Sequence, residues 1–154
     1  MKVLVPHDGS MISDRAFKKA IEFASKLNYE IILLHIIDLK LLQSESIVRY
    51  VREKQGLLRA KAELLKYLKM GSESMLKGKI EDAKKAGVRI RFTLGIGSTS
   101  EGIVKVARTE KVDFIIMGSR GLSSERSQSN KLRVLGSIAN RVSELADCPV
   151  MIVK

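Results

Sequence analysis

Short apolar runs alternate along the chain with longer segments whose apolar residues recur at helical spacing. Five such runs are separated by four segments of helical period. This alternation is typical of a parallel sheet that is covered by helices on both faces. The runs cover residues 2–6, 30–37, 88–94, 113–117 and 149–153. The pattern therefore predicts an α/β fold with an open five-stranded parallel sheet.

The same runs indicate which strands lie inside the sheet. Runs 30–37 and 113–117 are apolar almost throughout, as expected of strands buried on both faces. Run 88–94 alternates strictly between apolar and polar residues, so we expect an edge strand that is closed by a turn at 95–97. Run 149–153 is apolar on both faces, and an open edge of that kind favours pairing with another chain. We therefore expect a homodimer through 149–153, the alternative being that the chain covers this edge itself.

The longest connection runs from about residue 43 to residue 86. Its apolar stripe continues over most of this length, which indicates a helix. The sequence Gly-Ser-Glu-Ser at 71–74 predicts a break or a bend, and Gly87 ends the helical pattern. Further along, Ser98 and Glu101 have the spacing of a capping box that opens the next helix.

Composition narrows the class of protein. The 154 residues are 45% hydrophobic and 29% charged, the balance of one globular domain, 1–154, rather than of a disordered chain or a membrane protein. No apolar run approaches the ~20 residues that cross a bilayer. Cys148 is the single cysteine, so no internal disulfide can form. We therefore expect a cytoplasmic protein with no membrane partner.

The formal net charge of +11 comes mostly from residues 49–91, which hold 13 Lys and Arg against 5 Asp and Glu. A solvated helix face and a surface for nucleic acid or an acidic partner are both compatible with this segment. Aromatic residues make up only 5% of the chain, which leaves few side chains for base stacking, and no recognition motif is evident. Nucleic-acid binding is therefore not expected.

Two loops carry the residue types that a nucleotide site needs. Open parallel sheets bind ligands beyond the carboxyl ends of their strands, where the strand order reverses. Glycine lets the backbone approach a ligand closely, and the free N–H groups at a helix start bind phosphate oxygens. The carboxylate of Asp8 suits ribose hydroxyls or a metal-bridged phosphate. These loops follow the first and fourth runs, and they contain Asp8, Gly9, Gly118, Gly121, Gly136 and Ser137.

The spacing of Gly118, Gly121 and Gly136-Ser137 resembles the nucleotide motif of the ATP-binding universal stress proteins. That motif is glycine, two residues, glycine, nine residues, and then glycine with serine or threonine. Further landmarks of the resemblance, which covers essentially the whole chain, lie at 5–10, 33–38, 95–97 and 148–150. The family likeness implies a Rossmann-like sheet of order 3-2-1-4-5, which brings the two loops together at the switch point.

The resemblance also implies a ligand and its contacts. The ligand is ATP, alone or with Mg²⁺ or Mn²⁺, with AMP or ADP as alternatives, and no metal ligands are implied. Ile36 would lie beside the adenine. The positions that match the family's nucleotide contacts are Pro6, His7, Asp8, Ile36, Met117, Gly118, Gly121, Gly136, Ser137, Ile138 and Ala139.

One departure from the family motif leaves two functions open. Between Gly121 and Gly136 this chain has 14 residues, five more than the motif. Such a loop can bulge into solvent at little entropic cost. It can also abolish binding of the phosphates, or it can cover the ligand. The first hypothesis is a nucleotide-binding regulatory module that acts as a homodimer. The alternative is a stress-response interaction protein with the same fold and no ligand.

Enzyme chemistry is not indicated by the remaining residues. The sequence has no P-loop, and no nucleophile, base and orienting group can be assigned by spacing, so ATP hydrolysis is expected to be slow at most. His7 lies in the predicted site, where both a packing role and a ligand contact are open. His35 lies within a buried strand pattern and is predicted to be a core histidine.

Overall fold

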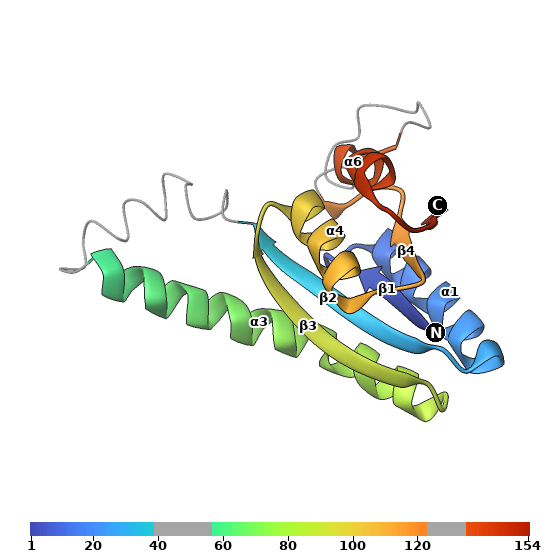
Figure 1. The fold of residues 1–154 in the computed structure, drawn as a ribbon. Coiled ribbons are helices and arrows are strands. Elements are labelled where there is room, and N and C mark those ends of the chain that lie inside the picture. Colours follow the sequence, from blue (N-terminus) through green and yellow to red (C-terminus); the bar gives the residue numbers. More distant parts are fainter. Residues whose placement is uncertain (39–56, 123–134) are drawn as a thin grey trace.

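The computed structural model describes residues 1–38, 57–122 and 135–154. Five strands form one sheet in the order β3-β2-β1-β4-β5, and each neighbouring pair is parallel (Figure 1). The predicted fold class and strand order are confirmed. The strands are β1 (Lys2–Pro6), β2 (Glu30–Asp38), β3 (Arg89–Gly97), β4 (Phe114–Gly118) and β5 (Val150–Val153).

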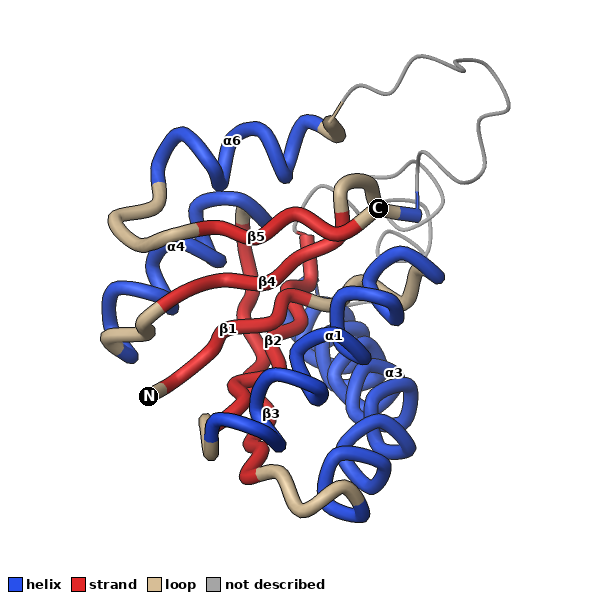
Figure 2. The backbone as a smooth tube through the Cα atoms, turned by 90° about the vertical axis from the view of Figure 1, so that its right-hand side faces the viewer, coloured by secondary structure: helices blue, strands red, loops and turns tan. Residues whose placement is uncertain are grey.

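Within the described residues, four helices cover the two faces of the sheet. They are α1 (Met11–Leu27), α3 (Leu57–Lys85), α4 (Thr99–Glu110) and α6 (Ser137–Leu145). Figure 2 shows α1 and α3 on one side of the sheet and α4 and α6 on the other. No helix in these described parts combines the length and apolar character needed to span a bilayer. The predicted stripe before residue 57, the basic positions 49–56 and the extra loop residues 123–134 lie outside the described residues.

Side-chain alternation along the inner strands builds two cores. Val3 and Val5 of β1 pack with α1 and α3, whereas Leu4 packs with α4 and α6. The middle of β2 is fully buried on both faces, as its continuous apolar run predicts. Each fully buried Leu or Ile contributes about 1.5–3 kcal/mol relative to an exposed one, so these strands anchor the whole fold.

The predicted break near Gly71 is wrong, because α3 is one continuous helix of 29 residues. Gly71 lies on its exposed side, and a glycine in a helix costs about 0.5–1 kcal/mol relative to alanine. The Ser72 hydroxyl donates to the Leu68 carbonyl oxygen at 2.8 Å, within the same helix. Leu76, one turn further on, is completely buried. Packing of this face against the sheet therefore outweighs the local preference for a bend.

Two details at the carboxyl end of β3 also differ from the predictions. β3 lies at the sheet edge as predicted, but residues 95–97 continue the strand, paired in register with 36–38 of β2, and do not form a turn. A Cβ at Gly95 would lie 3.2 Å from Ile36 Cγ1, so glycine permits this close pairing. Ser98 is the N-cap of α4, but its side chain makes no capping hydrogen bond. The predicted capping box is therefore not formed, and the Gly102 N–H bonds the Ser98 carbonyl oxygen at 2.9 Å.

Candidate functional site

The loops that follow β1 and β4 meet where the strand order reverses. The Asp8 carboxylate accepts hydrogen bonds from the Ser10 N–H at 3.0 Å and from the Leu122 N–H at 2.9 Å. A Cβ at Gly121 would overlap this carboxylate, so the second loop can come this close only because position 121 has no side chain. The structure thus brings Asp8 and Gly121, far apart in sequence, into direct contact.

The loop after β4 is also tied to the start of α6. The Ser119 N–H donates to the Val153 carbonyl oxygen at 2.7 Å, and the Gly136 N–H donates to the Ser119 carbonyl oxygen at 2.8 Å. Gly136 is the N-cap of α6, where no side chain caps the helix. The first N–H groups of a helix lack partners within the helix, and the helix dipole favours negative charge there. This helix start can therefore bind an anion such as a phosphate.

Strand alternation sorts the predicted site residues between the two faces of the sheet. Pro6 is paired in register with Leu34, which packs on the side of α4 and α6. Gly118 and His7 face α1 instead. The positions on the α4 and α6 side are Pro6, Ile36, Met117 and Ala139, and those around the loops and the helix start are Asp8, Gly121, Gly136, Ser137 and Ile138. The structure thus places the predicted residues in two groups, one on the α4 and α6 side and one at the loops and the helix start, and it directs the His7 ring towards α1.

His7 is buried, and its imidazole finds its partners inside the protein. Nδ1 lies 3.1 Å from the Gly9 N–H and must accept, so the proton of the neutral ring is on Nε2. Nε2 lies 2.9 Å from Asp14 Oδ1, which also accepts from Lys79 of α3. The ring meets Phe17 edge-on. These contacts give the His7 side chain a packing role, on the opposite face from Pro6.

Burial and hydrogen bonding set the charges of this region. Burial lowers the pKa of His7, and Lys79 lowers it further, although the hydrogen bond to Asp14 opposes this shift. Burial raises the pKa of Asp8, but hydrogen bonds from Ser10 and Leu122 outweigh it, so this pKa lies below its usual value. At neutral pH the site therefore holds a neutral imidazole on one face and a carboxylate at the rim.

His35 was predicted to be a core histidine, but in the structure it is only half-buried. Its Nδ1 lies 2.7 Å from the His7 carbonyl oxygen, which can only accept, so Nδ1 donates. This bond joins the carboxyl end of β2 to the start of the Asp8 loop. His35 is therefore part of the framework that holds the loop.

Two contacts at the site were not predicted. The Leu122 N–H is a backbone donor, and no side-chain pattern reveals it. Gly102 of α4 lies against Ile36, where a Cβ would come within 2.5 Å of Ile36 Cδ1. Gly102 interrupts a helical pattern, and that was the available signal for a close approach.

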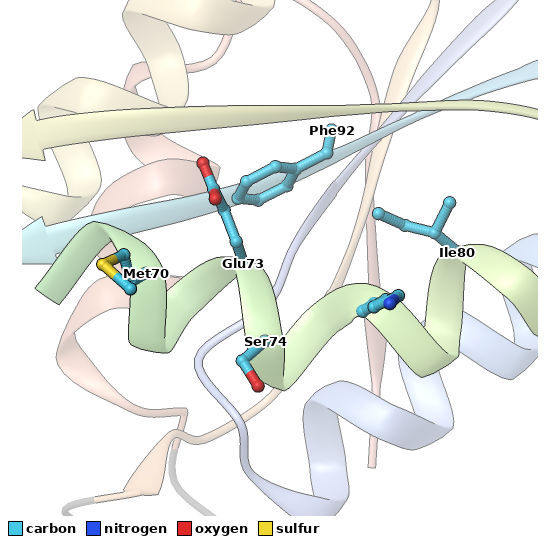
Figure 3. Close-up of a pocket in the computed structure, with 6 residues that line it drawn as sticks. Met70, Glu73, Ser74, Ile80 and Phe92 are labelled. Carbon is cyan, nitrogen blue, oxygen red and sulfur yellow. The ribbon is translucent and has the colours of Figure 1, made fainter. Parts of the chain in front are cut away.

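A groove of about 440 Å³ lies elsewhere, between α3 and β3 (Figure 3). It contains none of the predicted site residues. The lining side chains are Met70, Glu73, Ser74, Lys77, Ile80 and Phe92. Within the described residues, no group of three or more His, Cys, Asp and Glu side chains could hold a metal ion. The switch point, which joins polar loops from different strands, is thus the better candidate site.

The strand order and the flanking helices define a class, the doubly wound α/β proteins, whose ligand sites generally lie at the switch point of the sheet. The model of the universal stress protein family matches residues 1–154, and the chain belongs to this family. It is 32% identical over 157 residues to the universal stress protein MJ0577 of Methanocaldococcus jannaschii, covering 99% of this chain and 94% of that protein. The solved MJ0577 structure matches with a TM-score of 0.73 at 30% identity, over the same shares of the two chains.

Two more distant solved structures contain nucleotides. A universal stress protein from Archaeoglobus fulgidus in complex with dAMP matches with a TM-score of 0.66 at 16% identity, covering 100% of this chain and 98% of that one. A universal stress protein family protein from Arabidopsis thaliana with AMP bound matches with a TM-score of 0.63 at 20% identity, covering 100% and 91%. At these identities the likeness shows the shared fold alone.

Proposed function

We propose that this chain, as one domain spanning 1–154, is a nucleotide-dependent regulatory protein that binds an adenine nucleotide between the loops after β1 and β4. The contact of Asp8 with Gly121 and the Leu122 N–H carries the proposal, because it joins the two loops at the switch point. The structures of similar proteins with AMP and dAMP support an adenine nucleotide. The glycine motif favours ATP, with ADP and AMP as alternatives. The cytoplasmic location expected from the single cysteine remains a prediction.

The position of each residue suggests its role towards the nucleotide. Pro6 and Ile36 are partly exposed and offer apolar surface for the adenine on the α4 and α6 side, beside the buried Met117. We assign the Asp8 carboxylate to the ribose hydroxyls. We assign the N–H groups of 137–139 to the phosphates, because they lie at the start of α6. The His7 side chain is assigned to the loop and not to the ligand.

A divalent ion would be held chiefly by the nucleotide. Mg²⁺ is usually bound by one or two carboxylates together with substrate phosphates, and Asp8 supplies one carboxylate that is anionic at neutral pH. Hydrolysis is expected to be slow at most, because the His7 ring is already bonded to Gly9 and Asp14 and is not aimed at the phosphate side.

Calorimetric titration with ATP and Mg²⁺ tests the proposal directly. At 100 times its dissociation constant, a nucleotide should add about 2.7 kcal/mol to the free energy of unfolding. Gly121→Val should abolish the gain, because a side chain at 121 displaces the Asp8 carboxylate. Gly71→Ala on α3 is the matched control and should keep the gain, because a Cβ there meets none of the described residues within 4 Å. Absence of heat at millimolar nucleotide would contradict the proposal.

The ligand-free interaction protein is the second candidate. The observation in its favour is that the Asp8 carboxylate already accepts from two N–H groups of its own chain. The loop between Gly121 and Gly136 is also longer than the family motif. Under this hypothesis, wild type and Gly121→Val would both show no stabilisation by nucleotide.

We further infer a homodimer through β5. The Pro149 carbonyl oxygen accepts from the Ile115 N–H, and the Val153 carbonyl oxygen accepts from the Ser119 N–H. Successive residues of a strand direct their backbone groups to opposite sides, so the N–H and C=O groups of Val150 and Ile152 point away from β4. Outward N–H and C=O groups on an edge strand can pair with a second copy. The exposed Met151 side chain adds apolar surface there.

Ile152→Pro should convert the dimer into a monomer, because proline removes the outward N–H of the edge strand. Ile152→Ala is the matched control, since it loses the same side chain but keeps the N–H, and it should stay dimeric. Sedimentation equilibrium measures both species. A wild-type chain that is monomeric at all concentrations, or two variants with equal association, would rule out this interface.

A further inference from the structure

His7 supports the Asp8 loop from inside the protein. Its Nδ1 accepts the Gly9 N–H, while Asp8, on the other side of the loop, accepts from Ser10 and Leu122. Gly9 has a φ of +89°, a backbone conformation that side chains disfavour. The loop therefore depends on bonds from both sides, and His7 supplies the inner one.

We propose that His7 is the positioning residue of the nucleotide loop and that protonation of its ring weakens nucleotide binding. This inference rests on the proposed function, since it names a regulation of the same site. The ring lies behind the loop and is directed towards α1, so it acts through Gly9 and Asp8 without touching the ligand.

The donor and acceptor nitrogens of the ring explain why protonation weakens nucleotide binding. A neutral imidazole has one donor and one acceptor nitrogen, whereas a protonated imidazole has two donors. The protonated Nδ1 would face the Gly9 N–H, donor against donor. Ser13 Oγ lies 3.3 Å from Nδ1 and could accept instead, but the Gly9 N–H would then lose its partner. The loop would have to move, and Asp8 would move with it.

The titratable and charged groups around the His7 ring come from α1, α3, β2 and the Asp8 loop. Asp14 of α1 bonds Nε2, and Lys79 of α3 shares the same Asp14 oxygen. Asp8 lies in the loop itself, and His35 of β2 donates to the His7 carbonyl oxygen. Burial and Lys79 disfavour a second positive charge, while the two carboxylates favour it. Protonation therefore occurs on the acid side of the usual histidine range.

The pH dependence of the fold follows from the same balance. The folded pKa of His7 lies below the unfolded value of about 6.5, so the unfolded chain binds more protons between these two values. The contribution of His7 to the free energy of unfolding is complete above about pH 6.5. It falls as the pH drops through the folded pKa. This loss is measurable without any nucleotide.

Calorimetric titration of ATP with Mg²⁺ at pH 7.5 and pH 5.5 tests the proposal on wild type and two variants. In His7→Asn the side-chain oxygen can accept the Gly9 N–H, as in an Asx turn, and cannot titrate. In His7→Leu that acceptor is missing. Wild type should bind more weakly at pH 5.5, by up to about tenfold, because only the molecules with a protonated ring lose the bond to the Gly9 N–H.

The variants separate the loop effect from titration of the nucleotide. His7→Asn should bind like wild type at pH 7.5 and should lose this additional decrease at pH 5.5, so that only the nucleotide's own pH dependence remains. His7→Leu should bind weakly at both pH values. Equal pH slopes in wild type and His7→Asn would overturn the proposal, and so would normal binding by His7→Leu.

A measurement without ligand tests the positioning role of His7 independently of nucleotide binding. Hydrogen exchange of the Gly9 amide, corrected for the intrinsic effect of pH, should accelerate by up to about tenfold at pH 5.5 in wild type and stay constant in His7→Asn. If no nucleotide binds at any pH while Gly9 follows this pattern, the proposed function fails and the loop contact of His7 stands. If Gly9 exchange does not depend on the ring, the positioning role is wrong.

Discussion

Leu76→Ala is expected to lower the free energy of unfolding by about 2–5 kcal/mol, the range for a fully buried leucine. Leu76 has 0% exposure and packs with Ala83 and the α1 side of the sheet. The long helix α3 runs along β3 (Figure 1), so the loss of this side chain leaves a cavity beneath the helix. Urea denaturation followed by circular dichroism measures the change.

Tyr67→Ala provides the control on the same helix. Tyr67 is 69% exposed, and its truncation should change stability by about 0.5 kcal/mol or less. Equal losses in both variants would contradict the orientation of α3 on the sheet. A changed denaturant slope with Leu76→Ala would mean that α3 detaches before the rest of the fold unfolds.

Gly118→Ala is expected to destabilise the protein by about 1–3 kcal/mol through overpacking. A Cβ at Gly118 would lie 2.8 Å from Ile12 Cγ2 and 3.2 Å from the Ile12 carbonyl carbon. The backbone of α1 cannot yield as a side-chain tip does, so strand and helix must separate. Thermal or urea unfolding without nucleotide measures this effect.

Gly78→Ala is the matched substitution at an open position. A Cβ there meets no atom of the described part of the chain within 4 Å, and Gly78 lies inside α3, so alanine should stabilise the protein by about 0.5–1 kcal/mol. If Gly118→Ala proved as harmless as Gly78→Ala, the close packing of β4 on α1 would be wrong. Gly121 is the cleaner probe of the nucleotide site, because among the described residues its added Cβ would meet only the Asp8 side chain.

The sequence predicted the strands well, because burial on one or both faces leaves a local pattern of apolar residues. The inner runs 30–37 and 113–117 correspond to β2 and β4, and the alternating run 88–94 is the edge strand β3. The strand order did not follow from these patterns. It came from the family resemblance of the glycine motif, because periodicity says how a strand is buried and not which strand lies beside it.

By itself, the sequence determined the α/β class and the residues of the two loops that meet at the switch point. Only the tertiary structure decided that α3 passes through Gly71 without a break, that 95–97 extends β3, and that His7 faces α1. It also supplied the Leu122 N–H as a partner for Asp8. The physical reason is the same in each case: these features depend on contacts between segments far apart in the chain, which local propensity and spacing do not encode.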